Sequence, residues 1–327
     1  MSDPTTPRTR GRGIDHLLRR RGRMARPAAA GGGRRRPWRA LRAAVAGAVV
    51  MTLAGAAPGL ALAPPNARYA GGFLTAAAPL VSLHVSPTGD RLLLEAQAIA
   101  RCAGSRAIDA RLSLRTAVAA DGSFRGHATR TYRVNASESR TLSLEVSGRV
   151  IDARRAAGAL RLGAVRRRRR LAVVHCTTGP QPWEARSIVG ATTGPPEPLA
   201  GVSYYGATRQ PRAELPFPLA LHVSGDRTRV DTAVFRVFRR CRGVSSQDVA
   251  NDAPPTAIRQ DGTFSLVQRY SQRFTDSIEA FTFRFAGQFA TLGARGTLRA
   301  TSILRGLRTH RVIGRCDSGT VAWTATP

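Results

Sequence analysis

The chain has 327 residues, of which 51 are basic and 20 acidic, and its formal net charge at pH 7 is +31. Every basic residue is an arginine, which a GC-rich coding bias can produce, but the excess over acidic residues needs another reason. A hydrophobic content of 43% supplies cores for ordinary globular domains. An aromatic content of 6% leaves few side chains on which the bases of a single-stranded nucleic acid could stack.

The N-terminal region has two parts. Residues 1–42 are rich in arginine and are expected to be disordered, whereas residues 43–63 carry no charge. A basic flank before an apolar stretch is typical of an export signal, and Ala54-Gly55-Ala56 offers a cleavage site. If uncleaved, 21 apolar or uncharged residues also suffice for a single membrane anchor with the arginine-rich side inside. A true start at Met24 would shorten the leading segment, and in each case the rest of the chain is expected outside the cytoplasm.

The remainder of the chain is a tandem duplication. The tetrapeptide LHVS occurs at Leu83–Ser86 and again at Leu221–Ser224, and further landmarks follow both copies in the same order. The units are expected at 69–186 and 205–327, joined by a Gly- and Pro-containing linker at 187–204. The other landmarks, 140 positions apart, are Asp121–Phe124 and Asp261–Phe264, Cys176 and Cys316, and Trp183 and Trp323.

Each unit is predicted to be antiparallel β. Apolar and polar residues alternate in Phe281–Phe285 and in the matching Leu142–Val146, as a sheet with one buried face requires. The Asp-Gly pairs at 121 and 261 are expected to form tight hairpin turns. The predicted fold is all-β, with two tandem antiparallel β-sandwich or β-barrel domains, each with one disulfide, after an N-terminal hydrophobic segment.

The four cysteines fall two in each unit, and an even count points to disulfides in an oxidising compartment. Of the three possible pairings, Cys102 with Cys176 and Cys241 with Cys316 is favoured, because duplication of a bridged unit produces it directly. Metal binding by thiolates is the alternative, although no repeated Cys or His lies at ligand spacing, and no metal or cofactor is expected. Trp183 and Trp323 are expected to fill the core near each bridge.

One lead on a partner comes from arginine. Without residues 1–56, which hold 13 arginines and 2 aspartates, the chain keeps 38 arginines and 18 acidic residues. A run of five arginines lies between an expected bend at Gly163 and an expected apolar strand at Leu171–Val174. Guanidinium groups bind phosphate, sulfate or carboxylate, which favours an anionic envelope polymer or lipid as partner and makes nucleic acid the poorer candidate. The alternative is a solvated hairpin tip that keeps the protein soluble. The candidate polyanion-binding residues are Arg166, Arg167, Arg168, Arg169, Arg170, Arg305, Arg308 and Arg311.

No catalytic motif is evident, and no catalytic residue is assigned. The repeated His84 and His222 are expected to be exposed or hydrogen-bonded, since no repeated carboxylate completes a site around them. The repeated acids at Asp90 and Asp226 are expected in Gly-Asp-Arg turns, and those at 121 and 261 in the hairpin turns.

The order of an Asp-Gly-[Ser/Thr]-Phe turn, a Gly-x-Leu strand and a terminal Cys-x-x-Gly-x-x-x-Trp resembles uncharacterised exported tandem β-domain repeat proteins of GC-rich bacteria. The resemblance covers most of residues 69–327 and implies an extracytoplasmic β fold without implying an activity. The predicted function is an exported, non-enzymatic envelope or binding module, secreted or anchored at its N-terminus. The alternative is a secreted hydrolase with a site on loops.

Overall fold

The structure is a computed structural model that describes residues 63–75, 77–168, 171–189, 193–210, 215–274 and 276–327. The described residues contain nineteen strands and no helix, so the all-β prediction is confirmed. The expected arginine-rich segment at 1–42 and nearly all of the apolar segment at 43–63 lie outside the described residues. All the described residues belong to one compact unit.

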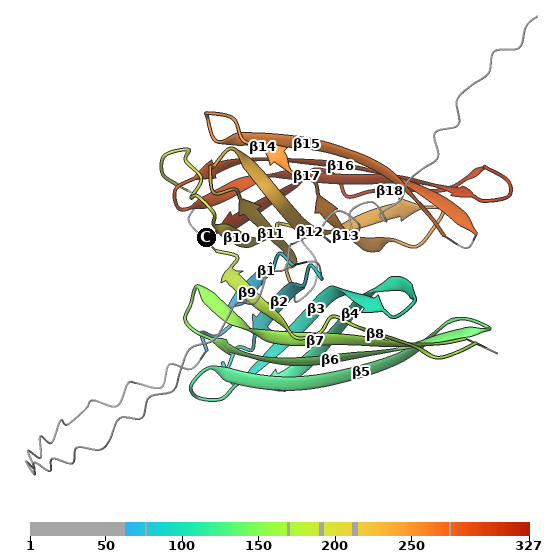
Figure 1. Ribbon diagram of the computed structural model, residues 1–327. Coiled ribbons are helices and arrows are strands. Elements are labelled where there is room, and N and C mark those ends of the chain that lie inside the picture. The colour runs from blue at the N-terminus through green and yellow to red at the C-terminus, as the bar shows by residue number, and fades with distance from the viewer. Residues whose placement is uncertain (1–62, 76, 169–170, 190–192, 211–214, 275) are drawn as a thin grey trace, which may run out of the picture. The chain divides into compact units, whose positions relative to one another are not determined.

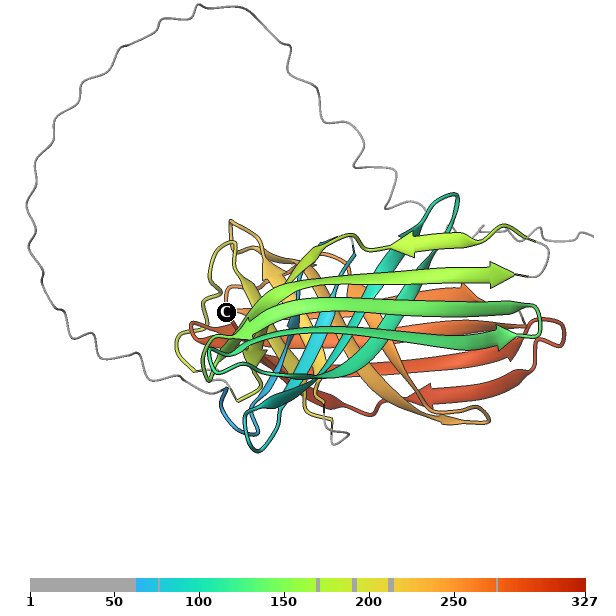
Figure 2. The ribbon, with the colours of Figure 1, turned by 90° about the horizontal axis from the view of Figure 1, so that it is seen from below.

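In the first repeat nine strands form one antiparallel sheet (Figures 1 and 2). Six of them, β1, β2, β3, β8, β7 and β9, pair in that order, and β9 pairs again with β1, so they close into a barrel. The sheet continues beyond β3 as β4, and beyond β7 as β6 and β5. The strands are β1 Arg68–Gly72, β2 Leu80–Val85, β3 Arg91–Cys102, β4 Ser105–Ala117, β5 Ser123–Asn135, β6 Glu138–Val150, β7 Arg155–Arg168, β8 Val174–Thr177 and β9 Gln181–Ser187.

The second repeat has the same architecture in ten strands. Its barrel is closed by β10, β11, β12, β18, β17 and β19, while β13 and β14 both pair with β12, and β16 and β15 extend the sheet beyond β17. The strands are β10 Ser203–Thr208, β11 Phe217–Val223, β12 Arg229–Arg242, β13 Gln247–Ala253, β14 Thr256–Ala257, β15 Thr263–Arg273, β16 Ser277–Ala290, β17 Gly293–Gly306, β18 Val312–Asp317 and β19 Val321–Thr326.

Alternation of side chains builds one core in each repeat. In β16 the phenylalanines at 281, 283 and 285 are buried and Arg284 between them is exposed, as the sequence predicts. In β6 the matching Leu142, Leu144 and Val146 are buried in the same way. The second core is richer in aromatic rings, and the Phe285 ring lies against both Phe235 and Phe264.

Both predicted disulfides are confirmed. Cys102 bonds to Cys176 and Cys241 to Cys316, and each pair lies directly opposite in neighbouring strands with Cα atoms 4.0 Å apart. In the first repeat β8 meets β3 over only two residue pairs, so the disulfide covalently holds the shortest seam of the barrel. Two disulfides are typical of an oxidising, extracytoplasmic environment.

The repeated glycines and tryptophans form a packing unit. A Cβ atom added at Gly148 would lie 2.6 Å from Cζ2 of Trp183, and one at Gly158 would lie 2.9 Å from it, so only glycine leaves room for the indole ring. Gly287 and Gly296 stand in the same way against Trp323. The tryptophans are core residues, as expected.

The expected position of the tryptophans near the disulfides is wrong. Cys176 faces Ala164 of β7, whereas Trp183 faces Gly158 of the same strand. These positions are six residues apart along an extended strand, or roughly 20 Å.

The Asp-Gly turns also differ from the prediction. Gly122 and Gly262 do have positive φ angles, 81° and 74°. The strands on either side, however, do not pair with each other: β4 and β5 lie at opposite ends of the strand order. The turn passes the chain from one edge of the curled sheet to the other, where the Thr116 hydroxyl donates a hydrogen bond to the Arg125 carbonyl oxygen.

Ion pairs join the two repeats inside the compact unit. Glu95 of the first repeat binds Arg236 of the second, whose side chain is 3% exposed. Arg111 joins the two sides again, with its Nε 2.9 Å from Glu95 and one terminal nitrogen 2.6 Å from Asp248. The Ser82 hydroxyl adds a hydrogen bond to the Pro216 carbonyl oxygen.

Candidate functional site

The candidate polyanion-binding arginines of the first repeat lie where β7 ends. We call Arg166, Arg167 and Arg168 the first arginine end; Arg169 and Arg170 lie outside the described residues. Two local expectations fail here. Gly163 makes no bend, because β7 continues through it, paired with Ser143. The segment 171–173 is not strand, and β8 starts only at Val174.

The first arginine end is partly neutralised. Glu138 accepts hydrogen bonds from Nε of Arg168 at 2.5 Å and from Arg140 at 2.8 Å. Burial works against ionisation of Glu138, but these hydrogen bonds outweigh it and hold its pKa below the usual value. Arg166 is half-buried and donates to the Ser105 hydroxyl at 3.1 Å. Arg167 is exposed, and within the described part of the chain it has no ion-pair partner.

The second group lies at the equivalent corner of the second repeat, where β17 ends and turns into β18. We call Arg305, Arg308 and Arg311 the second arginine end; all three are exposed. Arg305 donates to the carbonyl oxygen of His310 at 3.3 Å, which leaves most of its guanidinium donors to solvent. Both repeats thus carry arginine at the end of the strand that pairs with the strand of the second cysteine, β7 with β8 and β17 with β18.

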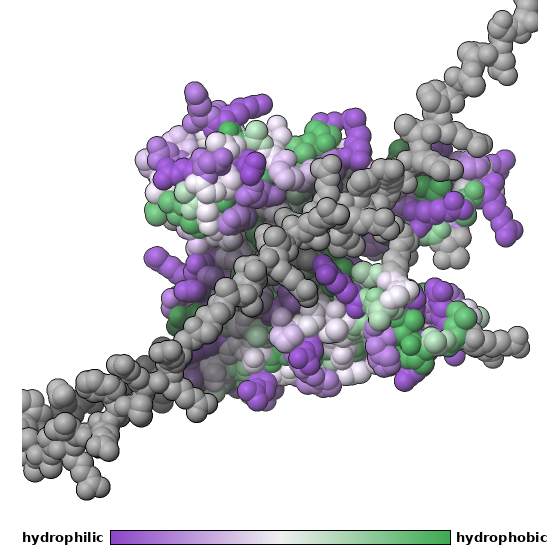
Figure 3. Space-filling model, in the orientation of Figure 1, coloured by the Kyte–Doolittle hydropathy of each residue, from purple (hydrophilic) through white to green (hydrophobic). Residues whose placement is uncertain are grey.

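Apolar residues accompany both arginine ends, a feature that sequence reasoning missed. Figure 3 shows hydrophilic and hydrophobic residues adjoining at the ends of the long strands. Half-exposed side chains near the first end are Val134, Leu171 and Val173, and near the second end Phe274, Val312 and Ile313. The sequence around these apolar residues does not show whether they are buried or exposed, because their exposure depends on where each segment lies relative to the barrel.

A third basic surface lies on the outer face of β15, β16 and β17. A groove of about 330 Å³ is lined by three arginines and two threonines, and we call it the arginine groove: Arg269, Thr282, Arg284, Arg299 and Thr301. Asp317 binds Arg299 through two hydrogen bonds, of 3.2 and 2.6 Å, which raise the pKa of the guanidinium and lower that of the carboxyl. Arg269 and Arg284 have no ion-pair partner among the described residues.

A larger cleft, of about 530 Å³, lies beside the ion pairs that join the repeats. Leu93, Phe217 and Leu215 supply apolar walls, and the carboxylates of Glu95 and Asp248 supply acidic groups. Arg111 forms ion pairs with both carboxylates. Burial lowers the pKa of the neighbouring Arg236 guanidinium more than Glu95 raises it. The cleft thus holds paired charges.

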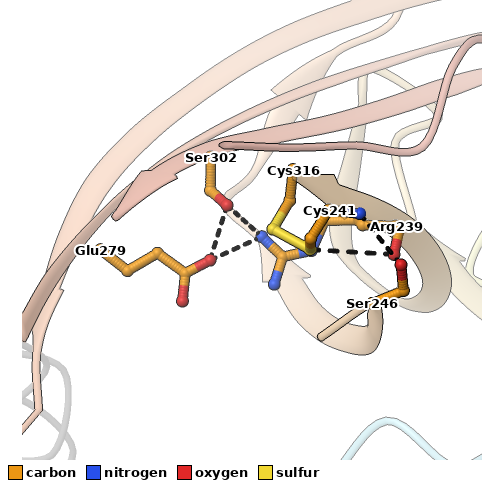
Figure 4. Close-up of a disulfide and its surroundings, with 6 residues drawn as sticks. All are labelled: Arg239, Cys241, Ser246, Glu279, Ser302 and Cys316. Atoms are coloured by element: carbon orange, nitrogen blue, oxygen red, sulfur yellow. Dashed lines mark hydrogen bonds and ion pairs between the residues drawn. A yellow bond between two sulfur atoms is a disulfide. The ribbon is translucent and has the colours of Figure 1, made fainter. Parts of the chain in front are cut away.

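The deepest charge of the second repeat lies in its core (Figure 4). Arg239 and Glu279 are 2% and 3% exposed, and their closest atoms are 2.8 Å apart. The Ser302 hydroxyl donates to Glu279 at 2.6 Å and lies 2.5 Å from the same nitrogen of Arg239. The guanidinium also stacks over the Phe281 ring, 5.0 Å from its centre. The first repeat has Ala100, Arg140 and Ala164 at the matching positions, so it lacks this ion pair.

The repeated histidines and aspartates take structural positions. His222 shares a hydrogen bond with the Ser203 hydroxyl at 3.1 Å, and both His84 and His222 are half-buried. Asp226 accepts hydrogen bonds from Ser224 and Thr228, which lower its pKa to about 2. Groups of three or more His, Cys, Asp or Glu able to hold a metal ion do not occur among the residues that the structure describes.

Comparison of the chain with protein-family models, with curated proteins and with solved structures finds no match. Within the described residues, no helix is long and apolar enough to cross a membrane. The arrangement of the residues themselves therefore carries the functional argument.

Proposed function

We propose that the chain is an exported, non-enzymatic module of the cell envelope that binds anionic polymers, with residues 43–63 as its export signal or membrane anchor. The supporting observation is that the same corner of both repeats presents arginine, although the residues around it differ. The two disulfides fit an exported protein.

Arginine suits this task because its planar guanidinium forms two parallel hydrogen bonds with a phosphate or carboxylate and never loses its charge. The second arginine end is the stronger of the two surfaces. Its three guanidinium groups are exposed, whereas Glu138 and Ser105 occupy Arg168 and Arg166 in the first. A polymer with one charge per repeating unit can contact several such groups at once, so modest contacts add up.

The test is binding of oxidised residues 57–327 to immobilised poly(glycerol phosphate), with a neutral glycan as reference, at low and high salt. These residues contain both cores and both disulfides of the described chain. The protein is expected to bind the phosphate polymer and not the neutral glycan, and to bind it more weakly as the salt concentration rises. The logarithm of the affinity is expected to fall by roughly 0.7–0.9 per logarithmic unit of salt for each phosphate contact, as for nucleic acids.

Two matched variants test whether the polymer binds at the second arginine end. R305S/R308S/R311S removes the second arginine end, and R125S/R161S/R295S removes three exposed arginines elsewhere with the same change in net charge. The first variant is expected to weaken binding at least tenfold and the second far less. Equal losses in the two variants would show that net charge alone attracts the polymer and would reject the assigned surface.

A secreted hydrolase is the second candidate, and its active site would lie in the cleft that Glu95 and Asp248 line. Two carboxylates facing a cleft are what glycoside hydrolysis requires, but here one arginine holds both. Release of reducing ends from envelope glycans by the wild type, abolished in D248N, would replace the binding function with this one.

A further inference from the structure

We propose that the arginine groove on the second repeat is a binding site for a single tetrahedral oxyanion, a phosphate or sulfate group. The site is distinct from both arginine ends, and it stands whether or not the polymer binding proposed above is correct. Its residues come from three neighbouring strands: Arg269 from β15, Thr282 and Arg284 from β16, and Arg299 and Thr301 from β17.

The strand register brings these groups together. Arg284 lies directly opposite Arg299, Thr282 lies opposite Thr301, and Arg269 lies opposite Thr282 on the other side. Side chains directly opposite on one face of an antiparallel sheet are about 5 Å apart at their Cβ atoms. Three guanidinium groups and the Thr282 hydroxyl therefore face one open groove as donors for the oxygens of one anion. The Thr301 hydroxyl also lines the groove but already donates to the Thr282 carbonyl oxygen at 3.5 Å.

The arrangement is unfavourable without an anion. Like charges directly opposite in a sheet destabilise it, and among the described residues Asp317 is the one acid that binds any of these arginines, through Arg299. Asp317 takes Nε and one terminal nitrogen of Arg299, and so fixes its orientation, while the other terminal nitrogen makes no hydrogen bond among the described residues.

The first repeat shows the same positions without the site. Glu145 stands where the second repeat has Arg284, and it lies directly opposite Arg161, which corresponds to Arg299. The other matching residues are Thr129, Ser143 and Gly163, in place of Arg269, Thr282 and Thr301. One repeat thus places opposite charges at facing positions, where the other has two facing arginines. Repulsion between like charges at a position where the other repeat has opposite charges is typical of a binding site, because ligand-binding groups often reduce the stability of the free protein.

The experiment measures thermal unfolding of residues 57–327 with inorganic phosphate, with sulfate and with chloride at equal ionic strength. Phosphate or sulfate is expected to raise the unfolding temperature in a saturable way, beyond the effect of chloride. NMR of the arginine Nε–H groups, compared between wild type and variants, is expected to show saturable shifts at Arg284 and Arg299.

R284E gives this position the facing opposite charges of the first repeat. It is expected to raise the unfolding temperature without phosphate and to remove the saturable response to phosphate, whereas E145Q, a matched change in the first repeat, is expected to leave that response intact. A response equal to that in chloride, or one that survives in R284E, overturns the proposal. R305S/R308S/R311S separates the two proposals: it is expected to lose polymer binding and to keep the response to inorganic phosphate.

Discussion

Replacement of Arg239 by methionine is expected to destabilise the second repeat strongly. Methionine nearly fills the space of the arginine stem but leaves the Glu279 carboxylate, 3% exposed, without its charged partner. Removal of one member of a buried ion pair costs about 3–5 kcal/mol of unfolding free energy, because the remaining charge is neither paired nor hydrated. For a repeat of this size, a loss of about 4 kcal/mol corresponds to a fall of roughly 16 °C in the unfolding temperature.

The assay uses the two buried tryptophans, one in each repeat. Trp183 and Trp323 are the tryptophans of residues 57–327, so a W183F background leaves fluorescence that reports the second repeat. Urea unfolding of R239M in this background, with the disulfides intact, gives the free energy directly. R295M is the matched control, because Arg295 is exposed, and it is expected to change stability by less than about 0.5 kcal/mol.

The double variant R239M/E279L tests the reasoning. If the cost in R239M comes from the stranded carboxylate, removal of both charges is expected to restore most of the stability, to within about 1–2 kcal/mol of the parent. The first repeat already folds with Ala100 at the position of Arg239. A loss below about 1 kcal/mol in R239M, or a double variant as unstable as the single one, refutes the idea that this pair is buried and mutually dependent.

Three further predictions follow from the fold. C102S/C176S opens a loop of 74 residues and is expected to lower the free energy of unfolding by about 4 kcal/mol on the chain-entropy argument, as measured by urea unfolding without reductant. G148A pushes a methyl group into Trp183 and is expected to cost about 1–3 kcal/mol and to shift the tryptophan emission, whereas S147A on the same strand is expected to change neither. Burial raises the pKa of Tyr69 and of Tyr270 to about 12, so both phenols stabilise the fold fully below their unfolded pKa near 10, and this contribution is lost as the pH rises from 10 through 12. Absorbance at 295 nm should show late ionisation of these two groups relative to the protein in denaturant, and their ionisation near pH 10 in the folded protein would contradict the burial.

Much of the fold could be predicted from the sequence because duplication preserves what local physics requires. Each repeat keeps a cysteine pair and a two-residue alternation, and these fix the disulfide pairing and the antiparallel β class. Strand order is different, since it depends on contacts far apart in the chain. The short β8 that closes the barrel between β3 and β7, and the turn at Gly122 that joins non-paired strands, have no local signature.

The candidate sites divide in the same way. A run such as Arg166–Arg170 is visible in the sequence, but its partial neutralisation by Glu138 depends on the register between β6 and β7. The arginine groove was missed because Arg269, Arg284 and Arg299 are about fifteen residues apart and meet only across three paired strands. One signal was available: alignment of the repeats places Arg284 on Glu145, a reversal of charge at an outward position.

The second repeat differs from the first both in its core and on its outer face. Its core contains a buried ion pair, Arg239 with Glu279, and its outer face carries facing arginines, and the first repeat has neither. The barrel strands, the disulfide and the glycine–tryptophan packing are common to both repeats. A buried pair adds little net stability over apolar residues of similar size, and facing arginines reduce it. Neither change is explained by folding alone. The outer change has a direct chemical use in binding an anion, and the buried pair fixes β16 to β17 through Ser302, the two strands that carry Arg284 and Arg299. A rigid pair of strands keeps the two guanidinium groups in place for the ligand, so the inner and outer changes of the second repeat serve the same surface.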